Sequence, residues 1–379
     1  AVIVITMRME SSLISAKYDY KEKIGTYNLS LISLTAVLTA VWALIINLFS
    51  GIFTELMSIG RMYINLMLIY CFFYAVINIF QMNERYAYRY KRSVAVALLV
   101  ALSTMITSIM LVICMNDRLT GRVLGGILPV VVIGFALLLY FAKHGKKLIF
   151  TTWAYVLKIC IPYIPHLLSL QVLNSVDRIM ITKICGLTDN ALYTIAYTCG
   201  HMVTLLMTSM NSAFAPWLGD KLNGGEKEEI QRTSKYYIIL FSVMAIGMML
   251  LAPEILLIMG GRSYLEAKYV MTPVAMGCVC QFMYTLYVNV EQFEKKTLGM
   301  AIASVAAALL NYGLNALLIP NYGYIAAAYT TLLGYVFLLV IHMVLVRMMG
   351  YGDVYNNKFV VIWVAVMCMV TLGVNYLYG

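Results

Sequence analysis

Long apolar runs recur along the whole chain, and short polar segments separate them. A hydrocarbon core of about 30 Å requires roughly 20 apolar residues per helix, and most of the runs reach that length. The pattern therefore predicts eleven complete membrane spans. They cover roughly residues 29–50, 62–81, 94–115, 122–142, 153–180, 190–214, 236–259, 268–290, 298–319, 322–346 and 359–378.

The first residues, AVIVITM, are apolar but too few to span. They have neither a basic region nor a cleavage site of small residues, so they do not form a signal peptide. We expect them to be the tail of a partial first helix. The sequence thus predicts an all-α polytopic membrane protein that is truncated at its N-terminus.

Composition and charge agree with a membrane protein. Hydrophobic residues make up 62% of the chain and charged residues 12%, against about 25% charged in a soluble domain. The net charge is +10, but the basic residues lie in short loops, so we attribute it to membrane topology rather than to nucleic-acid binding. One set of alternate loops carries 18 Lys and Arg and the other set 7, which places the first set in the cytoplasm.

A charged pair, Asp177 and Arg178, interrupts the apolar run at residues 153–180. A charge near the bilayer centre costs about 2.5–3.5 kcal/mol on insertion scales, so the pair should face protein or water. At 100° per residue one helix face becomes polar and ends in an arginine. The residues of this polar stripe are Gln171, Asn174, Ser175, Arg178 and Thr182.

Two interpretations of the pair stay open, because a long side chain near a helix end can also anchor at the headgroups. Other polar groups in apolar runs are weaker signals. Arg8 and Glu10 are two apart, and we do not expect them to share a helix face. We interpret Glu254, Glu291, His201 and His342 as packed or interfacial side chains.

Signs of enzyme chemistry are absent from the sequence. It contains no GxxxxGK[ST] loop, no HExxH motif and no CxxC motif, and its outer loops are short. We therefore predict no catalytic residue, no metal site and no cofactor. Movement of a substrate across the membrane is the function that the pattern favours.

Five stretches carry a resemblance to a known family. They are LNSVDRIMITKICGLTDNALYTIAY (173–197), FAPWLGDKLNGGEKEEI (214–230), GGRSYLEAKYVMTPVAMG (260–277), NALLIPNYGYIAAAYTTLLGY (315–335) and MESSLISAKYDYKEK (9–23). Together they resemble bacterial polysaccharide and O-antigen repeat-unit flippases, which belong to the multidrug/oligosaccharidyl-lipid/polysaccharide exporter superfamily.

The resemblance implies two helical lobes around a central cavity. It assigns residues 1–147 to the remainder of the N-terminal lobe, 148–346 to the C-terminal lobe and 347–379 to an additional helix. Transport would follow alternating access. The substrate would be an undecaprenyl-diphosphate-linked oligosaccharide, carried across the bacterial cytoplasmic membrane for O-antigen, capsule or exopolysaccharide synthesis.

The same resemblance suggests roles for individual residues. Arg178 would contact the diphosphate, because guanidinium groups bind phosphate oxygens in pairs, and Asp177 would orient it. Asn174 and Gln171 would bind sugar hydroxyls. Arg8, Glu10 and Lys17 are further candidates for substrate contacts, and Asp177 or Glu10 for proton or sodium coupling. Membrane lipid and a polysaccharide polymerase or glycosyltransferases are expected partners.

Three other interpretations stay open from the sequence. One is a multidrug or cation exporter of the related branch, which should present acidic groups to its substrate. Another is a membrane-embedded polysaccharide polymerase or sugar transferase, which would need a larger outer loop than MNDRLTGR (115–122). The last is a non-functional fragment.

Overall fold

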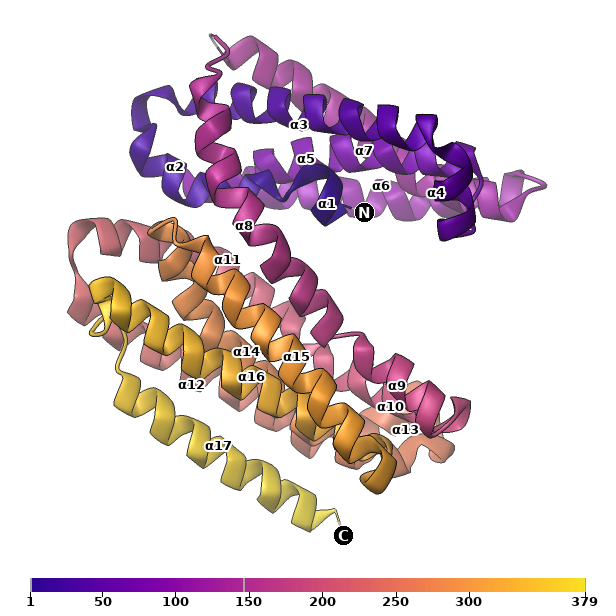
Figure 1. Ribbon diagram of the computed structural model, residues 1–379, viewed down its shortest axis with the longest axis vertical. Helices are drawn as coiled ribbons and strands as arrows, with labels where there is room; N and C mark the ends of the chain where they lie inside the picture. Colours follow the sequence, from indigo (N-terminus) through magenta and orange to yellow (C-terminus); the bar gives the residue numbers. More distant parts are fainter. Residues whose placement is uncertain (1, 146, 379) are drawn as a thin grey trace. The chain divides into compact units, whose positions relative to one another are not determined.

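The computed structural model describes residues 2–145 and 147–378, and every regular element it assigns there is helical (Figure 1). Contacts between Cα atoms divide the chain into an N-terminal unit, Ala1–Ile164, and a C-terminal unit, Pro165–Gly379. Within the described residues, ten helical spans are long and apolar enough to cross a membrane. The expected class, an all-α polytopic membrane protein with two helical lobes, is confirmed.

The N-terminal unit begins with short helices and continues with long ones. The short elements are α1 (Val2–Thr6), η1 (Met9–Ser12), α2 (Leu13–Asp19), η2 (Lys21–Lys23) and α4 (Ser50–Met57). The long helices are α3 (Ile24–Leu48), α5 (Arg61–Tyr86), α6 (Tyr90–Cys114), α7 (Arg118–His144) and the first part of α8 (Thr151–Leu173).

Helices α6 and α7 pack against each other through small residues. A Cβ atom added to Gly125 of α7 would lie 2.4 Å from the Cα atom of Ser108 on α6. A neighbouring glycine, Gly126, has open space around the same position. Since membrane helices gain little from burying apolar surface against each other, this close backbone approach is what holds the pair together.

The C-terminal unit contains the rest of α8 and eleven further elements. They are α9 (Val176–Ile184), α10 (Leu187–His201), α11 (Val203–Gly224), α12 (Lys227–Leu250), α13 (Ala252–Gly260), η3 (Arg262–Ala267), α14 (Lys268–Phe293), α15 (Thr297–Tyr322), α16 (Tyr324–Val346), η4 (Arg347–Tyr351) and α17 (Asn357–Leu377).

Helix α14 forms the centre of this unit and contacts α10, α11, α12, α16 and α17. In the most apolar 18-residue stretch of its span, 83% is buried inside the protein. In the other nine spans the buried share of the corresponding stretch is between 6% and 44%. Its mean hydropathy of 1.2 is the lowest of the ten. A helix surrounded by protein needs less apolar surface than one surrounded by lipid, which explains both values.

Three predicted runs are interrupted in the structure. The run at 190–214 is divided between α10 and α11, neither of which is among the ten spans, and i→i−3 hydrogen bonds replace the regular pattern around Met202. The run at 236–259 breaks at Leu251, because Pro253 begins a new helix. The run at 153–180 breaks between α8 and α9.

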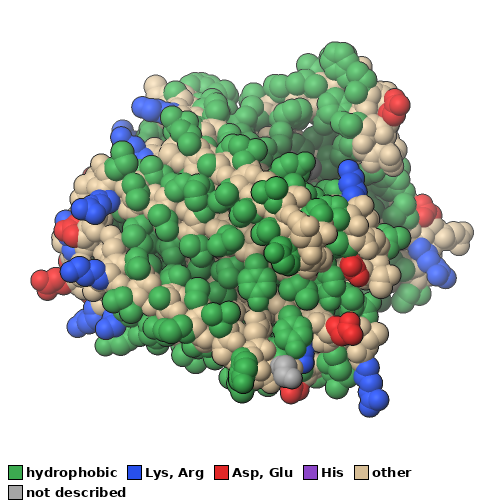
Figure 2. All heavy atoms as spheres, turned by 60° about the horizontal axis from the view of Figure 1, so that its bottom comes forward, with side chains coloured by type: hydrophobic (Ala, Val, Ile, Leu, Met, Phe, Trp, Pro, Cys, Tyr) green, Lys and Arg blue, Asp and Glu red, His purple; other side chains and the backbone are tan. Residues whose placement is uncertain are grey.

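Large apolar side chains remain exposed along the outer faces of the spans, including Leu98 and Ile109 of α6 and Val132 of α7. Figure 2 shows hydrophobic side chains over most of the visible surface, with charged side chains near its margins. Such a surface is expected where lipid, rather than water, surrounds the helices.

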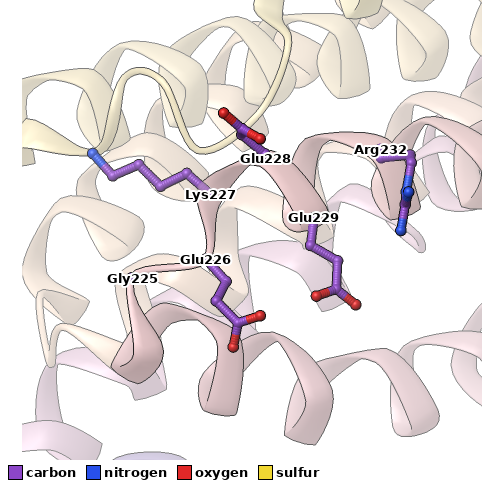
Figure 3. A pocket seen from close by; sticks show the side chains of 6 residues that line it. All are labelled: Gly225, Glu226, Lys227, Glu228, Glu229 and Arg232. Atoms are coloured by element: carbon purple, nitrogen blue, oxygen red, sulfur yellow. The ribbon is translucent and has the colours of Figure 1, made fainter.

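The polar connection between α11 and α12 surrounds a pocket of about 770 Å³. Glu226 and Glu229 point to the same side of it, and Lys227 points away from them (Figure 3). Lys221 pairs with both carboxylates, at 2.7 Å from Glu226 and 2.6 Å from Glu229. The acidic cluster at the start of α12 is thus neutralised in part by a lysine in the last turn of α11.

Candidate functional site

The predicted polar stripe lies where α8 ends and α9 begins. Asn174 and Ser175 occupy the break, and Ser175 precedes the first turn of α9 with φ −127° and ψ −25°. The sequence predicted one continuous helix face, but the structure divides the stripe between two helices. Gln171, at the exposed end of α8, donates from Nε2 to Ser175 Oγ at 3.2 Å, which bridges the break.

Asp177 is buried, with 1% of its surface exposed, and three side chains donate to its carboxylate. Tyr193 Oη of α10 lies 2.8 Å from Oδ2, Thr331 Oγ1 of α16 lies 2.6 Å from Oδ2, and Asn315 Nδ2 of α15 lies 2.6 Å from Oδ1. These bonds join α9 to three other helices. The structure thus gives Asp177 a large share in holding the unit together.

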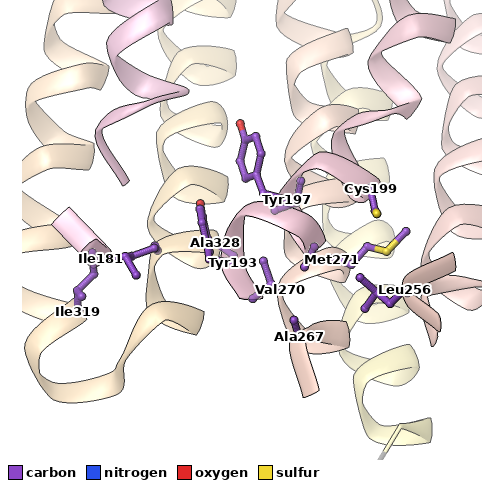
Figure 4. Close-up of a cluster of buried hydrophobic side chains, with 14 of the residues drawn as sticks. Ile181, Tyr193, Tyr197, Cys199, Leu256, Ala267, Val270, Met271, Ile319 and Ala328 are labelled. Atoms are coloured by element: carbon purple, nitrogen blue, oxygen red, sulfur yellow. The ribbon is translucent and has the colours of Figure 1, made fainter. Parts of the chain in front are cut away.

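Asn315 extends this network, since Nδ2 also donates to Asn311 Oδ1 at 3.2 Å and Oδ1 accepts from Thr330. An apolar cluster surrounds the network. Figure 4 shows Ile181 of α9 beside Ile319 of α15. Buried polar groups that bond to one another in apolar surroundings fix helix positions, because each unmade bond is costly there.

Arg178 has a different environment from its neighbour. Its guanidinium carbon lies 5.0 Å from the centre of the Tyr197 ring, and Nε is buried without a hydrogen-bond partner in the structure. Tyr197 in turn stacks on His201, with ring centres 5.3 Å apart. No ion pair of Arg178 is found among the described residues, so no carboxylate neutralises this cation.

The expected contact between Asp177 and Arg178 is therefore not observed in the part of the chain that the structure describes. Successive helix residues point about 100° apart, and the three donors draw the carboxylate into the interior. Asn174 does lie close to the arginine's aromatic partner. Its Oδ1 accepts from Tyr197 Oη at 2.9 Å and from Tyr335 Oη at 2.6 Å, which leaves its amide hydrogens available.

The remaining candidates, Arg8, Glu10 and Lys17, belong to the N-terminal unit. Arg8 Nε lies 3.1 Å from Glu10 Oε1, so the two residues pair although they are only two apart. The sequence-based expectation was wrong because α1 ends at Thr6 and both Met7 and Arg8 have positive φ, 51° and 48°. This turn brings the two side chains together.

Lys17 lies at the end of α2, with its ammonium nitrogen 5.0 Å from the centre of the Tyr88 ring. It lines a pocket of about 160 Å³ together with Lys21 and Arg89. A pocket with three cations is suited to an anion such as phosphate.

Two models of known protein families match this chain, over ranges that overlap. A family model described as "Polysaccharide biosynthesis protein" matches residues 1–221. This chain belongs to the polysaccharide biosynthesis protein family. A second model, MatE, matches residues 162–317. The family member is thus a membrane transporter of the multidrug/oligosaccharidyl-lipid/polysaccharide exporter superfamily and not an enzyme.

Solved structures share the fold of this family member at low sequence identity. The Vibrio cholerae MATE transporter VcmN in the bent form has a TM-score of 0.75 and 13% identity, over 94% of this chain and 86% of that one. A superfamily transporter from Pyrococcus furiosus has a TM-score of 0.73 and 14% identity, over 92% and 84%. No curated protein sequence matches the chain.

Sequence reasoning missed the polar partners of Asp177 in this transporter. Asn311 and Asn315 are four apart on α15, and Thr330 and Thr331 are adjacent on α16. Two amides at helical spacing in an apolar run indicate a polar face, which is a signal that the sequence contained. Which residue that face would meet depends on helix packing.

Proposed function

We propose that this family member is a flippase for an undecaprenyl-diphosphate-linked oligosaccharide. It would carry the repeat unit from the cytoplasmic to the outer face of the bacterial cytoplasmic membrane. O-antigen, capsule or exopolysaccharide synthesis would use the product. The observation that carries the proposal is Arg178, a partly buried cation held against an aromatic ring without a carboxylate partner among the described residues.

The environment of Arg178 favours an anionic substrate. Contact with the Tyr197 ring holds the guanidinium group, and no hydrogen bond from that group is found among the described residues. A diphosphate offers oxygens that accept such donors in pairs. Asn174 and Gln171 lie close to Arg178 in the sequence. The amide hydrogens of Asn174 and the exposed side chain of Gln171 can donate to sugar hydroxyls.

A cation exporter is the second candidate, because the neighbours of known structure include MATE transporters. Such a protein needs a carboxylate that is free to meet its substrate. Asp177 already accepts three hydrogen bonds inside the C-terminal unit, and Glu10 already pairs with Arg8. The Pyrococcus furiosus structure is described with the statement that reverse polarity of its binding pocket suggests a different function, so this fold is compatible with more than one substrate charge.

Reconstituted transport tests the proposal. The protein is placed in liposomes that carry a fluorescent prenyl-diphosphate oligosaccharide, and exposure of the label on the other leaflet is followed. We compare wild type with Arg178→Ala and Arg178→Lys. Lys183→Ala is the matched control, since Lys183 is an exposed cation on the same helix.

Hydrogen bonds to a charged group contribute about 1.5–3 kcal/mol, so Arg178→Ala should slow flipping by about 10- to 100-fold. Arg178→Lys should keep part of the rate, and Lys183→Ala all of it. An Arg178→Ala protein that inserts normally and flips at the wild-type rate would show that the arginine only anchors its helix. Export of a cationic dye by a wild type that leaves the diphosphate in place would favour the cation exporter.

A further inference from the structure

A second buried polar cluster lies in the C-terminal unit, apart from Asp177. Glu291 of α14 and His342 of α16 are both fully buried, and His166 of α8 is 2% exposed. His342 Nδ1 lies 2.9 Å and 3.0 Å from the two carboxylate oxygens of Glu291. The ring centres of His166 and His342 are 6.2 Å apart. Three titratable side chains from three helices thus meet out of contact with solvent.

The two nitrogens of His342 differ in their surroundings. Nδ1 is held by the carboxylate, whereas Nε2 is buried and has no hydrogen-bond partner in the described structure. A neutral imidazole that keeps its hydrogen on Nδ1 presents a lone pair at Nε2. That lone pair is the position of the cluster that can accept a hydrogen bond or a proton.

Charge balance favours one added proton at this pair, and the unpartnered Nε2 is the position that can accept it. With a neutral imidazole, the Glu291 carboxylate is a buried charge without a counter-ion, which is costly in an apolar interior. One proton added at Nε2 makes His342 an imidazolium and brings the net charge of the pair from −1 to zero. The Tyr284 ring, stacked on His342 with ring centres 5.5 Å apart, favours the cation further.

We propose that Glu291, His342 and His166 form a proton-binding site inside the C-terminal unit, with Nε2 of His342 as the acceptor. The proton comes from water and returns to water, and no other bond forms or breaks. His166 fixes the site, since its Nδ1 lies 2.5 Å from Ser304 Oγ on α15. The site assigns the transporter a ligand that does not depend on its organic substrate.

The helices that carry the cluster also carry other titratable groups. Tyr351 Oη donates to Glu294 Oε1 at 2.5 Å, one turn beyond Glu291. No ion pair other than that with His342 is found for Glu291 in residues 2–145 and 147–378. The groups on these helices and on the segments that follow them include Lys268, Tyr269, Cys278, Cys280, Tyr284 and Tyr287 on α14, Lys295 and Lys296 after it, Tyr312 and Tyr322 on α15, Tyr324, Tyr329 and Tyr335 on α16 and Arg347 on η4.

Proton binding at this site links pH to the conformation of the unit. A conformation that admits water to Glu291 can release the proton at little cost, while the closed arrangement described above favours the neutral pair. The occupied and empty states of the site therefore stabilise different conformations.

Histidine NMR tests the site directly, because the chain contains only four histidines. The full chain is labelled with ¹⁵N-histidine, placed in lipid nanodiscs and titrated between about pH 5 and pH 9. His342→Asn identifies the His342 signals. His144, which is exposed, gives a signal from a solvent-facing histidine in the same sample.

We expect the His342 signals to change from the doubly to the singly protonated form as pH rises. Glu291→Gln should move that change to lower pH, because a neutral amide no longer favours the imidazolium, and Glu294→Gln should leave it in place. His342 signals that keep one protonation state over the whole pH range would overturn the proposal. So would a His342 titration that Glu291→Gln leaves unaltered.

If Glu291→Gln does not fold, the wild-type titration of His342 still tests whether the site binds a proton. Glu291→Asp, which keeps the charge and shortens the side chain, then replaces Glu291→Gln as the test of coupling between the two residues. The measurement records no transport, so its failure is distinct from a failure of the proposed flippase activity.

Discussion

Removing the donors or the acceptor of the Asp177 network should destabilise the C-terminal unit in graded steps. Thr331→Val deletes the hydrogen bond to Asp177 and the one that Thr331 Oγ1 accepts from Asn311 Nδ2 at 3.3 Å, with almost no change in shape. Asp177→Ala deletes three and leaves Tyr193, Thr331 and Asn315 without their partner. Interhelical hydrogen bonds in membrane proteins contribute about 0.6 to 1.7 kcal/mol each.

From these values, Thr331→Val should lower the free energy of unfolding by about 1–3 kcal/mol and Asp177→Ala by about 2–5 kcal/mol. For a unit of this size 1 kcal/mol corresponds to a change in Tm of about 2–4 °C. The expected losses are therefore about 2–12 °C for Thr331→Val and roughly 4–20 °C for Asp177→Ala. Once Asp177 is Ala, Thr331→Val should have a smaller effect, because only the bond with Asn311 is left to lose.

A thermal assay with a thiol-reactive dye suits this chain. Cys199, Cys278 and Cys280 are buried in the C-terminal unit and become reactive as it unfolds. Thr371→Val is the matched control, since Thr371 is buried but donates mainly to its own helix, at 2.8 Å from Met367 O. If Asp177→Ala inserts normally and unfolds within about 1 °C of wild type, well below the expected shift, the reasoning about this network is refuted.

Two other predictions concern packing and pH. Gly125→Ala should lower the unfolding free energy of the N-terminal unit by roughly 1–3 kcal/mol, and with it the Tm, because the new methyl group would meet the Ser108 backbone. Gly126→Ala should leave the Tm unchanged in the same assay, since Gly126 has open space at this position. Lys227 Nζ lies 2.9 Å from Asp353 Oδ2, and its ammonium group lowers the pKa of Asp353. This contact is thus complete at neutral pH and is lost as pH falls through that lowered pKa, so proteolysis in the segment before α17 should increase in acid and, at neutral pH, in Asp353→Asn. Equal cleavage of Asp353→Asn and wild type at every pH would contradict this account.

The sequence predicted the membrane class and most of the spans, because apolar length is a local property. It did not predict the break at Asn174 and Ser175 or the pairing of Arg8 with Glu10, since both depend on backbone turns. The contact between Glu291 and His342 joins residues 51 positions apart. Only the packing of α14 against α16 brings them together, and a lone buried histidine gives no sign of it in the sequence.

Helix α14 has a consequence for how the chain is made. The span that contains it is the least apolar of the ten and the most enclosed by protein. Transfer into lipid therefore stabilises this helix less than it stabilises the other nine spans. During synthesis it leaves the ribosome before α15, α16 and α17, two of which contact it closely. Asn289 finds its partner, Asn211, on the earlier helix α11, but Glu291 lacks His342 until α16 is inserted, and Thr272 lacks Asn375 until α17 is inserted. We therefore expect α14 to pack first on the helices before it and to complete its polar contacts only when α16 and α17 enter the bilayer.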